Sequence, residues 1–406
     1  MMSETAGTSE RSDQLSWVAD VLGWTLSSEA GVGPRDARRF AILPNAHRPK
    51  VLVPLGRRDL GPGALAGYND SMSQPIRLGR AVMGQILRLG LDRLLGIERA
   101  VFSARETASP PFLEYLESVL DEPVEVSVAL VPTPRPNRKP VLRILSLRGK
   151  PLAYAKVGWN DLTRRLVSEE ASALRALASA GLRRLRAPEL LHAGTWAGRS
   201  VVLTSPMTTP LVRRCRRNAP PSIDAEREVS GSMWHGREPL GSNHYVDELL
   251  ERLREKHAAR ARLVERLEAV VGRVRDVSSH ATFGAWHGDW APWNMSRLSG
   301  ALSVWDWERF GGPVPFGFDR AHLHFQVAHM VGGRSVEDAA NRALKALEAI
   351  PEIRAMGPGG APSILSLYLI EQVLRLEEGR SAGEAIRPGV VDAIVDHLEA
   401  GMKVRG

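Results

Sequence analysis

An acid and an amide lie five residues apart in an aromatic stretch, AWHGDWAPWNM, which spans Ala285–Met295. Pro292 lies between Asp289 and Asn294 and excludes a regular helix, so the two side chains can converge from one irregular loop. A second acid, Asp306, follows in VWDWE, twelve residues after Asn294. Carboxylate and amide oxygens are hard ligands suited to magnesium, and a remaining carboxylate can accept a proton from a substrate hydroxyl.

The segment between the two loops predicts a short hairpin. MSRL and ALSV flank Gly300, which permits a turn, and their pairing would bring Asn294 and Asp306 together at one end. We therefore predict that Asn294 and Asp306 hold a metal ion on phosphates and that Asp289 acts as the catalytic base. This is the division of labour used in phosphoryl transfer.

The third expected component is Lys156, a lone lysine in the apolar run LAYAKVG. Burying its charge is unfavourable unless it is paired. The following segment, DLTRRLVSEEASALRALASAG, has helical periodicity, with Asp161 as the expected N-cap and Gly181 as the terminator. Glu170 lies on its apolar face and is the predicted partner, whereas Glu169 is about 100° further round the helix.

The elements that must position these residues divide at VPTPRPNRKP, which carries four prolines in ten residues and excludes a helix or a central strand. The length of 406 residues allows two or three domains. We predict an α+β fold with an additional N-terminal segment at 1–121, a small lobe at 122–207 and a helical large lobe at 208–406. The N-terminal segment should contain both helices and strands but carries no chemical motif, and its first 14 or so residues are expected to be disordered.

Apolar periodicity predicts the elements of each part. RFAILP and KVLVPLG indicate strands, and Ile76–Gly96 indicates a helix. VEVSVALV is a further strand, VLRILSL and PLAYAKVG form a hairpin around RGK, and RSVVLTSPM is the next strand. His244–Val277 is too long for one helix in a compact domain and should bend or break. DRAHLHFQVAHMVGG and APSILSLYLIEQVLRLEEG indicate two more helices.

Taken together, these motifs resemble those of the aminoglycoside phosphotransferase and choline kinase family, distant relatives of the protein kinases. HGDWAPWN resembles the catalytic loop, WDWE the metal-binding aspartate segment, and FGFDRAHL the aspartate-bearing segment that follows. AKVG together with Glu170 resembles the lysine–glutamate pair of the small lobe. The resemblance covers the chain from Glu122 onward, roughly 70% of its length.

The resemblance implies a bilobal protein-kinase-like fold, with a small β-rich lobe and a larger helical lobe. It also implies roles: Asp289 as the catalytic base, Asn294 and Asp306 as magnesium ligands, and Lys156 on the α- and β-phosphates. The strand that ends near Met207 would be the hinge, where backbone groups meet adenine. The implied cofactors are ATP, or another nucleoside triphosphate, and Mg²⁺.

One departure from that family is the proline-rich loop, which stands where protein kinases have a glycine-rich phosphate loop. Proline has no backbone N–H to offer a phosphate. Arg135, Arg138 or Lys139 could contact phosphates instead, or could be solvated loop cations. The N-terminal segment is the second departure, and it could be a cap on the small lobe, an oligomerisation surface or a regulator.

Several neighbouring residues have simpler explanations than catalysis. Asp289 alone could be a turn residue bonded to its own backbone. We expect His287 to brace the loop through a hydrogen bond and Asp319 to brace it from the following helix. Glu308 could either assist the metal or cap the next segment.

The remaining histidines and tryptophans are expected to pack. His322, His324 and His329 lack the spacing of a metal site, and we interpret them as packing or surface residues. Trp305 and Trp307 should lie under the hairpin. Trp290 and Trp293 could line an acceptor pocket, although core packing is slightly favoured. Five of the ten tryptophans in the chain fall between positions 286 and 307.

We therefore predict an ATP-dependent phosphotransferase that acts on a hydroxyl of a small molecule: a sugar, an amino alcohol or an aminoglycoside-like compound. The alternative is a catalytically inactive pseudokinase that binds nucleotide. The net charge of +8 comes from scattered arginines without a nucleic-acid motif, so no nucleic-acid partner is expected. No apolar run of membrane-spanning length is present, so no membrane partner is expected either. A single cysteine, Cys215, favours the cytoplasm.

Overall fold

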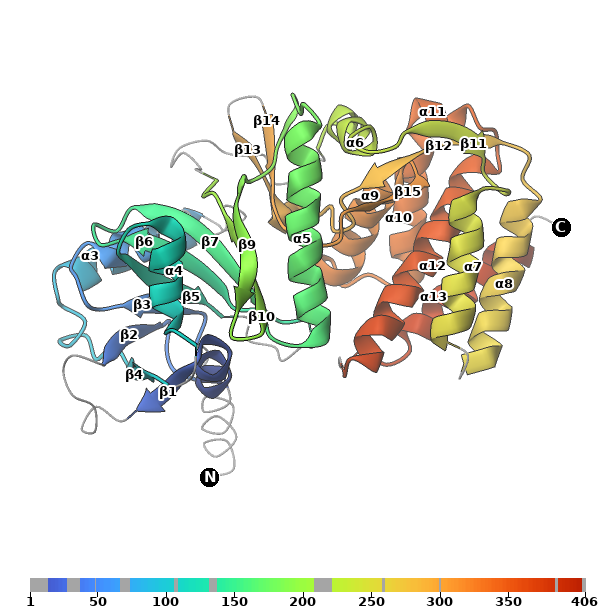
Figure 1. Cartoon of the computed structure of the whole chain (residues 1–406). Helices are drawn as coiled ribbons and strands as arrows, with labels where there is room; N and C mark the ends of the chain where they lie inside the picture. Colours follow the sequence, from blue (N-terminus) through green and yellow to red (C-terminus); the bar gives the residue numbers. More distant parts are fainter. Residues whose placement is uncertain are drawn as a thin grey trace. The chain divides into compact units, whose positions relative to one another are not determined.

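A computed structural model of the chain describes residues 14–27, 37–47, 49–65, 74–105, 109–130, 137–207, 221–257, 260–298, 301–383 and 386–403. They form two compact units, the first from residues 1–171 and 188–212 and the second from 172–187 and 213–406. The fold is α+β, with a unit built on a large sheet and a mainly helical unit (Figure 1). The expected disorder at the N-terminus, Cys215 and Arg135 all lie outside the described residues.

The first unit is built on a nine-stranded sheet in the order β1-β4-β2-β3-β5-β6-β7-β10-β9, and all its pairings are antiparallel. Strands from before and after residue 121 share this sheet, because β3 pairs with β5. Its elements are β1 (Trp24–Ser27), β2 (Arg38–Leu43), β3 (Val51–Pro54), α2 (Leu60–Leu65), α3 (Gln74–Arg88), β4 (Arg99–Ala104), α4 (Phe112–Leu120), β5 (Val124–Ala129), β6 (Val141–Ser146), β7 (Pro151–Gly158), α5 (Asp161–Ser179), β9 (Leu190–Trp196) and β10 (Arg199–Thr204).

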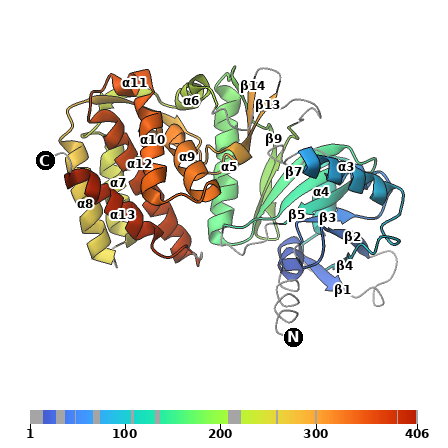
Figure 2. The same cartoon turned by 180° about the vertical axis from the view of Figure 1, so that it is seen from behind.

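Helices cover both faces of this sheet. Alternate residues of β2 point to opposite faces: Phe40 and Ile42 join a core under α4, whereas Ala41 and Leu43 join a core under α2 and α3. Figure 1 shows α4 over one face, and the reverse view in Figure 2 shows α3 over the other. The apolar run of β3, which is buried at every position, follows from this two-sided burial.

The second unit is mainly helical. Its elements are β8 (Leu185–Arg186), α6 (Ile223–Ser230), β11 (Gly236–Pro239), α7 (His244–His257), α8 (Ala261–Arg275), β12 (His280–Trp286), η2 (Pro292–Asn294), β13 (Met295–Leu298), β14 (Ala301–Val304), β15 (Gly311–Pro315), α9 (Phe318–Gln326), η3 (Val327–Val331), α10 (Val336–Glu348), α11 (Pro351–Arg354), α12 (Gly360–Ser381) and α13 (Val390–Lys403). One apolar core joins α7, α8, α9, α10, α12 and α13. Two three-stranded sheets, β11-β12-β15 and β13-β14-β8, carry the loops of interest.

Most expected elements are present, with two differences. The helix expected over Ile76–Gly96 ends at Arg88, and turns follow to Gly96, because Gly90 adopts a left-handed φ of 71°. The segment from His244 does break, into α7 and α8. The cap of α5 is Asn160 rather than Asp161, since the Asn160 side chain accepts a hydrogen bond from the Thr163 N–H at 2.8 Å.

No helix among the described residues is long and apolar enough to cross a membrane.

Candidate active site

The loop after β12 is held by hydrogen bonds to its backbone. Asp319, in the first turn of α9, accepts from the N–H groups of His287 at 2.8 Å and Gly288 at 3.2 Å. The expectation that Asp319 braces this loop is therefore confirmed. Gly288 has a left-handed φ of 81°, and a Cβ there would lie 2.3 Å from the Arg309 carbonyl oxygen. The tight turn thus requires glycine.

His287 is buried and ties the first loop to the second. Its Nδ1 accepts from the Asp289 N–H at 3.1 Å, so its Nε2 carries the proton and donates to the Trp305 carbonyl at 3.1 Å. Burial lowers the pKa of His287 to about 4, against the raising effect of nearby acids. The ring is neutral at pH 7 with both nitrogens engaged. This confirms the expected bracing role.

The predicted hairpin is present and brings the two loops together. β13 pairs antiparallel with β14, from Met295 opposite Val304 to Leu298 opposite Ala301. Beyond its end, the Trp305 N–H donates to the Asn294 carbonyl at 3.0 Å. Asn294 and Asp306 therefore flank one hydrogen-bonded end of the hairpin, as their spacing predicts.

Asp289 is held at both carboxylate oxygens. The Asn294 Nδ2 donates to Oδ2 at 2.8 Å and to the Asp289 carbonyl at 3.0 Å, while His322 Nε2 lies 3.0 Å from Oδ1. Burial alone would raise the pKa of the Asp289 carboxyl, but its hydrogen bonds and the neighbouring histidines hold that pKa well below its usual range. Asp289 is therefore ionised, fixed in direction and a weak base.

The sequence did not predict the contact of His322 with Asp289, because its spacing from His324 and His329 indicates only packing or surface residues. Asp319 and His322 are three residues apart on α9 and so share a face of the helix. Tyr368, on α12, contacts the other nitrogen of His322, with its hydroxyl 3.2 Å from Nδ1. Burial lowers the pKa of His322. A neutral ring would accept from Tyr368 at Nδ1 and donate to Asp289 from Nε2.

Arg375, which follows Tyr368 by two turns of α12, also reaches the loop. Its guanidinium donates to the Gly288 carbonyl and lies 4.3 Å from the centre of the Trp286 ring. It contacts Glu371 at 3.6 Å on its own helix. Seven residues separate Tyr368 from Arg375, which puts both on one side of α12. No motif marked these two residues in the sequence.

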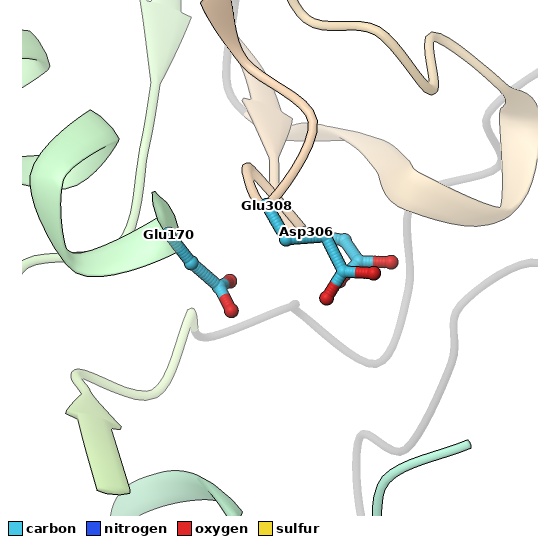
Figure 3. Close-up of side chains that lie close together, drawn as sticks. All are labelled: Glu170, Asp306 and Glu308. Carbon is cyan, nitrogen blue, oxygen red and sulfur yellow. The ribbon is translucent and has the colours of Figure 1, made fainter. Parts of the chain in front are cut away.

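Two acids lie beside each other after β14. Carboxylate oxygens of Asp306 and Glu308 lie within 4.8 Å of one another, and Figure 3 shows both side chains projecting from the same loop. Asp306 has a left-handed φ of 69°, which is uncommon for a residue with a Cβ. Strained backbone of this kind is often found at functional sites.

The tryptophans of the two loops differ in burial. Trp290 and Trp307 are fully buried, which confirms core packing for both, and the Trp307 Nε1–H donates to the Val304 carbonyl at 2.9 Å. Trp293 and Trp305 are only partly buried. Trp305 was expected in the core, but its position at the hairpin end leaves part of the ring outside.

In the first unit, Lys156 and Glu170 form the expected ion pair, with a distance of 2.7 Å between Nζ and the carboxylate. Lys156 is opposite Val202 on β10, so both side chains leave the same face of the sheet. Val202 packs against Val167 and Ala171 of α5, which puts Glu170 over the lysine. Only 16% of the Lys156 side chain and 2% of the Glu170 side chain are exposed.

Met207, the predicted hinge residue, lies three residues beyond β10 and is partly buried. Glu169, the weaker candidate partner, instead faces Arg165 at 3.7 Å. Of the basic loop residues, Arg138 is not a solvated cation, which was one of the two alternatives that the sequence left open. It is buried, and its guanidinium lies 3.9 Å from the centre of the Trp17 ring. Burial lowers its pKa to about 10.

The chain was compared with known proteins. No protein-family model matches it, and no curated protein matches its sequence. Among solved structures it is similar to a spectinomycin phosphotransferase in complex with ADP and spectinomycin, at 13% identity and a TM-score of 0.41, covering 73% of this chain and 99% of the other. It is also similar to an ethanolamine kinase from Plasmodium vivax, at 10% identity and a TM-score of 0.39, covering 85% and 94%. A glucosamine kinase in complex with glucosamine, ADP and inorganic phosphate is similar at 16% identity and a TM-score of 0.33, covering 75% and 85%.

Proposed function

We propose that this chain is an ATP-dependent phosphotransferase that transfers the γ-phosphoryl group to a hydroxyl of a small molecule. The observation that carries the proposal is the Asp289 carboxylate, ionised and held at 2.8 Å by Asn294 and 3.0 Å by His322, next to the hairpin end that joins Asn294 to the Asp306 turn.

Asp289 would act mainly by orienting the acceptor hydroxyl. A phosphoryl group passes through a loose transition state, so the nucleophile needs little activation before the bond to the leaving group is largely broken. A carboxylate with a pKa below its usual range accepts a hydrogen bond from the hydroxyl and takes its proton late. The hydrogen bonds from His322 and Asn294 fix the orientation of the carboxylate and therefore the directions of its remaining lone pairs.

The donor set fits a magnesium ion. Two neighbouring carboxylates, Asp306 and Glu308, lie close enough to repel each other unless a cation or another positive group compensates, and the Asn294 amide oxygen is a further hard ligand. We propose Asn294 and Asp306 as ligands, with Glu308 assisting. Bound magnesium would neutralise charge on the nucleotide phosphates.

In the first unit, Lys156 is the residue proposed to contact the α- and β-phosphates, with Glu170 fixing the ammonium group in place. The backbone near Met207 is the proposed adenine contact. The source of the nucleotide would be the cytoplasmic pool. A sugar, an amino alcohol and an aminoglycoside-like compound are all admissible acceptors.

The test is magnesium-dependent ATP consumption with a panel of sugars, amino alcohols, choline and aminoglycosides. Turnover with one acceptor that is lost in Asp289→Asn would establish the activity and identify the class of acceptor. Binding of magnesium–ATP without turnover by any acceptor would instead support the nucleotide-binding pseudokinase.

A further inference from the structure

Large apolar side chains are exposed in one short stretch of the first unit. Thirteen such side chains are exposed among the described residues, and seven of them lie between residues 76 and 95. The seven belong to α3 and to the turns that follow it: Ile76, Leu78, Val82, Leu89, Leu91, Leu94 and Leu95. Exposed apolar side chains that gather in one segment mark an interaction site more often than isolated exposed residues do.

Helix α3 is apolar on two opposite sides. Met83 and Leu87 pack into the core that α2 and α3 share with the sheet. Leu78 and Val82 are four residues apart and therefore share a face, which Leu89 continues on the far side from Leu87. Leu78 is 68% exposed and Leu89 is 66% exposed, so these side chains project outward and do not line a groove.

The turns after α3 are fixed to the unit. Asp92 is buried and forms an ion pair with Arg99 of β4, and the Leu95 N–H donates to the Leu91 carbonyl at 3.1 Å. Leu94, 82% exposed, is therefore presented on an ordered turn. Exposure here is not the fraying of a loose end.

The same stretch is rich in arginine. It contains Arg77, Arg80, Arg88 and Arg93, and the sequence from Ser71 to Leu91 contains no acidic residue. Arg88 is partly compensated by Asp59 at 3.4 Å. Asp92 is buried, so it adds no negative charge to the surface.

We propose that the apolar-basic face formed by the exposed side chains of residues 76–95 binds an anionic membrane surface. Leucines that project from a helix and its following turn can enter the acyl boundary, while arginines meet lipid phosphates. Charge complementarity selects this partner over a second copy of the chain, because two such faces would bring arginines against arginines. This proposal departs from the expectation of no membrane partner, which rested on the absence of an apolar run of membrane-spanning length; peripheral binding does not need such a run. This inference is independent of the proposed function.

The test is flotation of the full-length chain with vesicles of phosphatidylglycerol and phosphatidylcholine, compared with phosphatidylcholine alone. We expect at least tenfold greater partitioning onto the anionic vesicles, weakened by salt. The double variant Leu78→Glu/Leu94→Glu changes two exposed side chains and should lose this binding. The matched control is Leu191→Glu, at a leucine 44% exposed on β9, and it should keep it.

Failure of the wild-type chain to float with anionic vesicles would overturn the proposal, as would equal loss in the Leu191→Glu control. Light scattering without lipid supplies a further outcome. A doubled mass that the double variant abolishes would assign the face to contact between copies and overturn the membrane assignment.

Discussion

The Asp289 loop and the Lys156–Glu170 pair hold charged side chains in two different ways. Each carboxylate oxygen of Asp289 is held by a separate element, Asn294 on η2 and His322 on α9. Lys156 and Glu170 instead form one direct ion pair on a nearly dry face of the sheet. The orientation of the Asp289 carboxylate therefore depends on several hydrogen bonds. The Lys156–Glu170 arrangement depends on one ion pair, in which each buried charge is stabilised by the other.

The largest expected effect comes from removing the Asp289 carboxylate. Asp289→Asn removes the group that orients and deprotonates the acceptor, and loss of a general base lowers turnover by about 10²–10⁴-fold. Steady-state ATP consumption measures it. Asp276→Asn, at an exposed aspartate after α8, is the control and should retain full activity. Full activity in Asp289→Asn would show that this carboxylate is structural.

Disruption of the Lys156–Glu170 pair should instead lower the free energy of unfolding. Lys156→Met leaves Glu170 with a buried charge and without this cation, and breaking a buried pair costs about 3–5 kcal/mol. Replacing both residues with Met should restore much of the loss, because two apolar side chains fit a dry face. Urea unfolding measures both variants.

Lys150→Met, at an exposed lysine just before β7, is the control for that comparison. A single Lys156→Met variant as stable as the wild type would show that water screens the pair. The Asp289 loop should behave differently, since replacing only one of the two partners, Asn294 or His322, leaves the other in contact with the carboxylate.

The brace at His287 predicts a pH dependence. Its folded pKa of about 4 is below the unfolded value, so the neutral ring stabilises the fold fully above about pH 6.5 and this contribution is lost as pH falls through 4. Relative to His287→Gln, the stability advantage of the wild type should shrink by roughly 3 kcal/mol between pH 6.5 and 4. Comparing the two proteins by calorimetry cancels the pH-dependent contribution of the acidic groups that both contain. A constant difference would contradict a buried neutral ring.

The sequence predicted best what depends on short spacing. The hairpin followed from MSRL and ALSV, and the ion pair followed from a lone lysine and the helical position of Glu170. Asp319 as a brace also followed from the motif. In each case the residues that matter lie within one motif or on adjacent elements.

The sequence could not predict contacts made across the packed helices. Tyr368 lies 46 residues from His322, and its contact depends on how α12 packs against α9. The burial of Arg138 depends on Trp17, which comes from a segment without a recognisable motif. The sequence did not predict the end of α3 at Arg88, because the apolar periodicity continues past Gly90. The left-handed φ of Gly90, which stops the helix, is visible only in the structure.

The smallest expected effect tests whether the Asp289 carboxylate is held by more than one element. His322→Phe keeps a planar ring but removes the donor to Oδ1, and a hydrogen bond to a charged group contributes about 1.5–3 kcal/mol. Turnover should therefore fall about 10–100-fold, while the KM for ATP stays near that of the wild type, because Asn294 still holds Oδ2. His322→Gln restores an N–H donor and should recover part of the rate. His244→Asn, at an exposed histidine on α7, is the control. If His322→Phe and His322→Gln lose activity and melting temperature equally, His322 serves packing alone, and the carboxylate of Asp289 is directed by Asn294 without it.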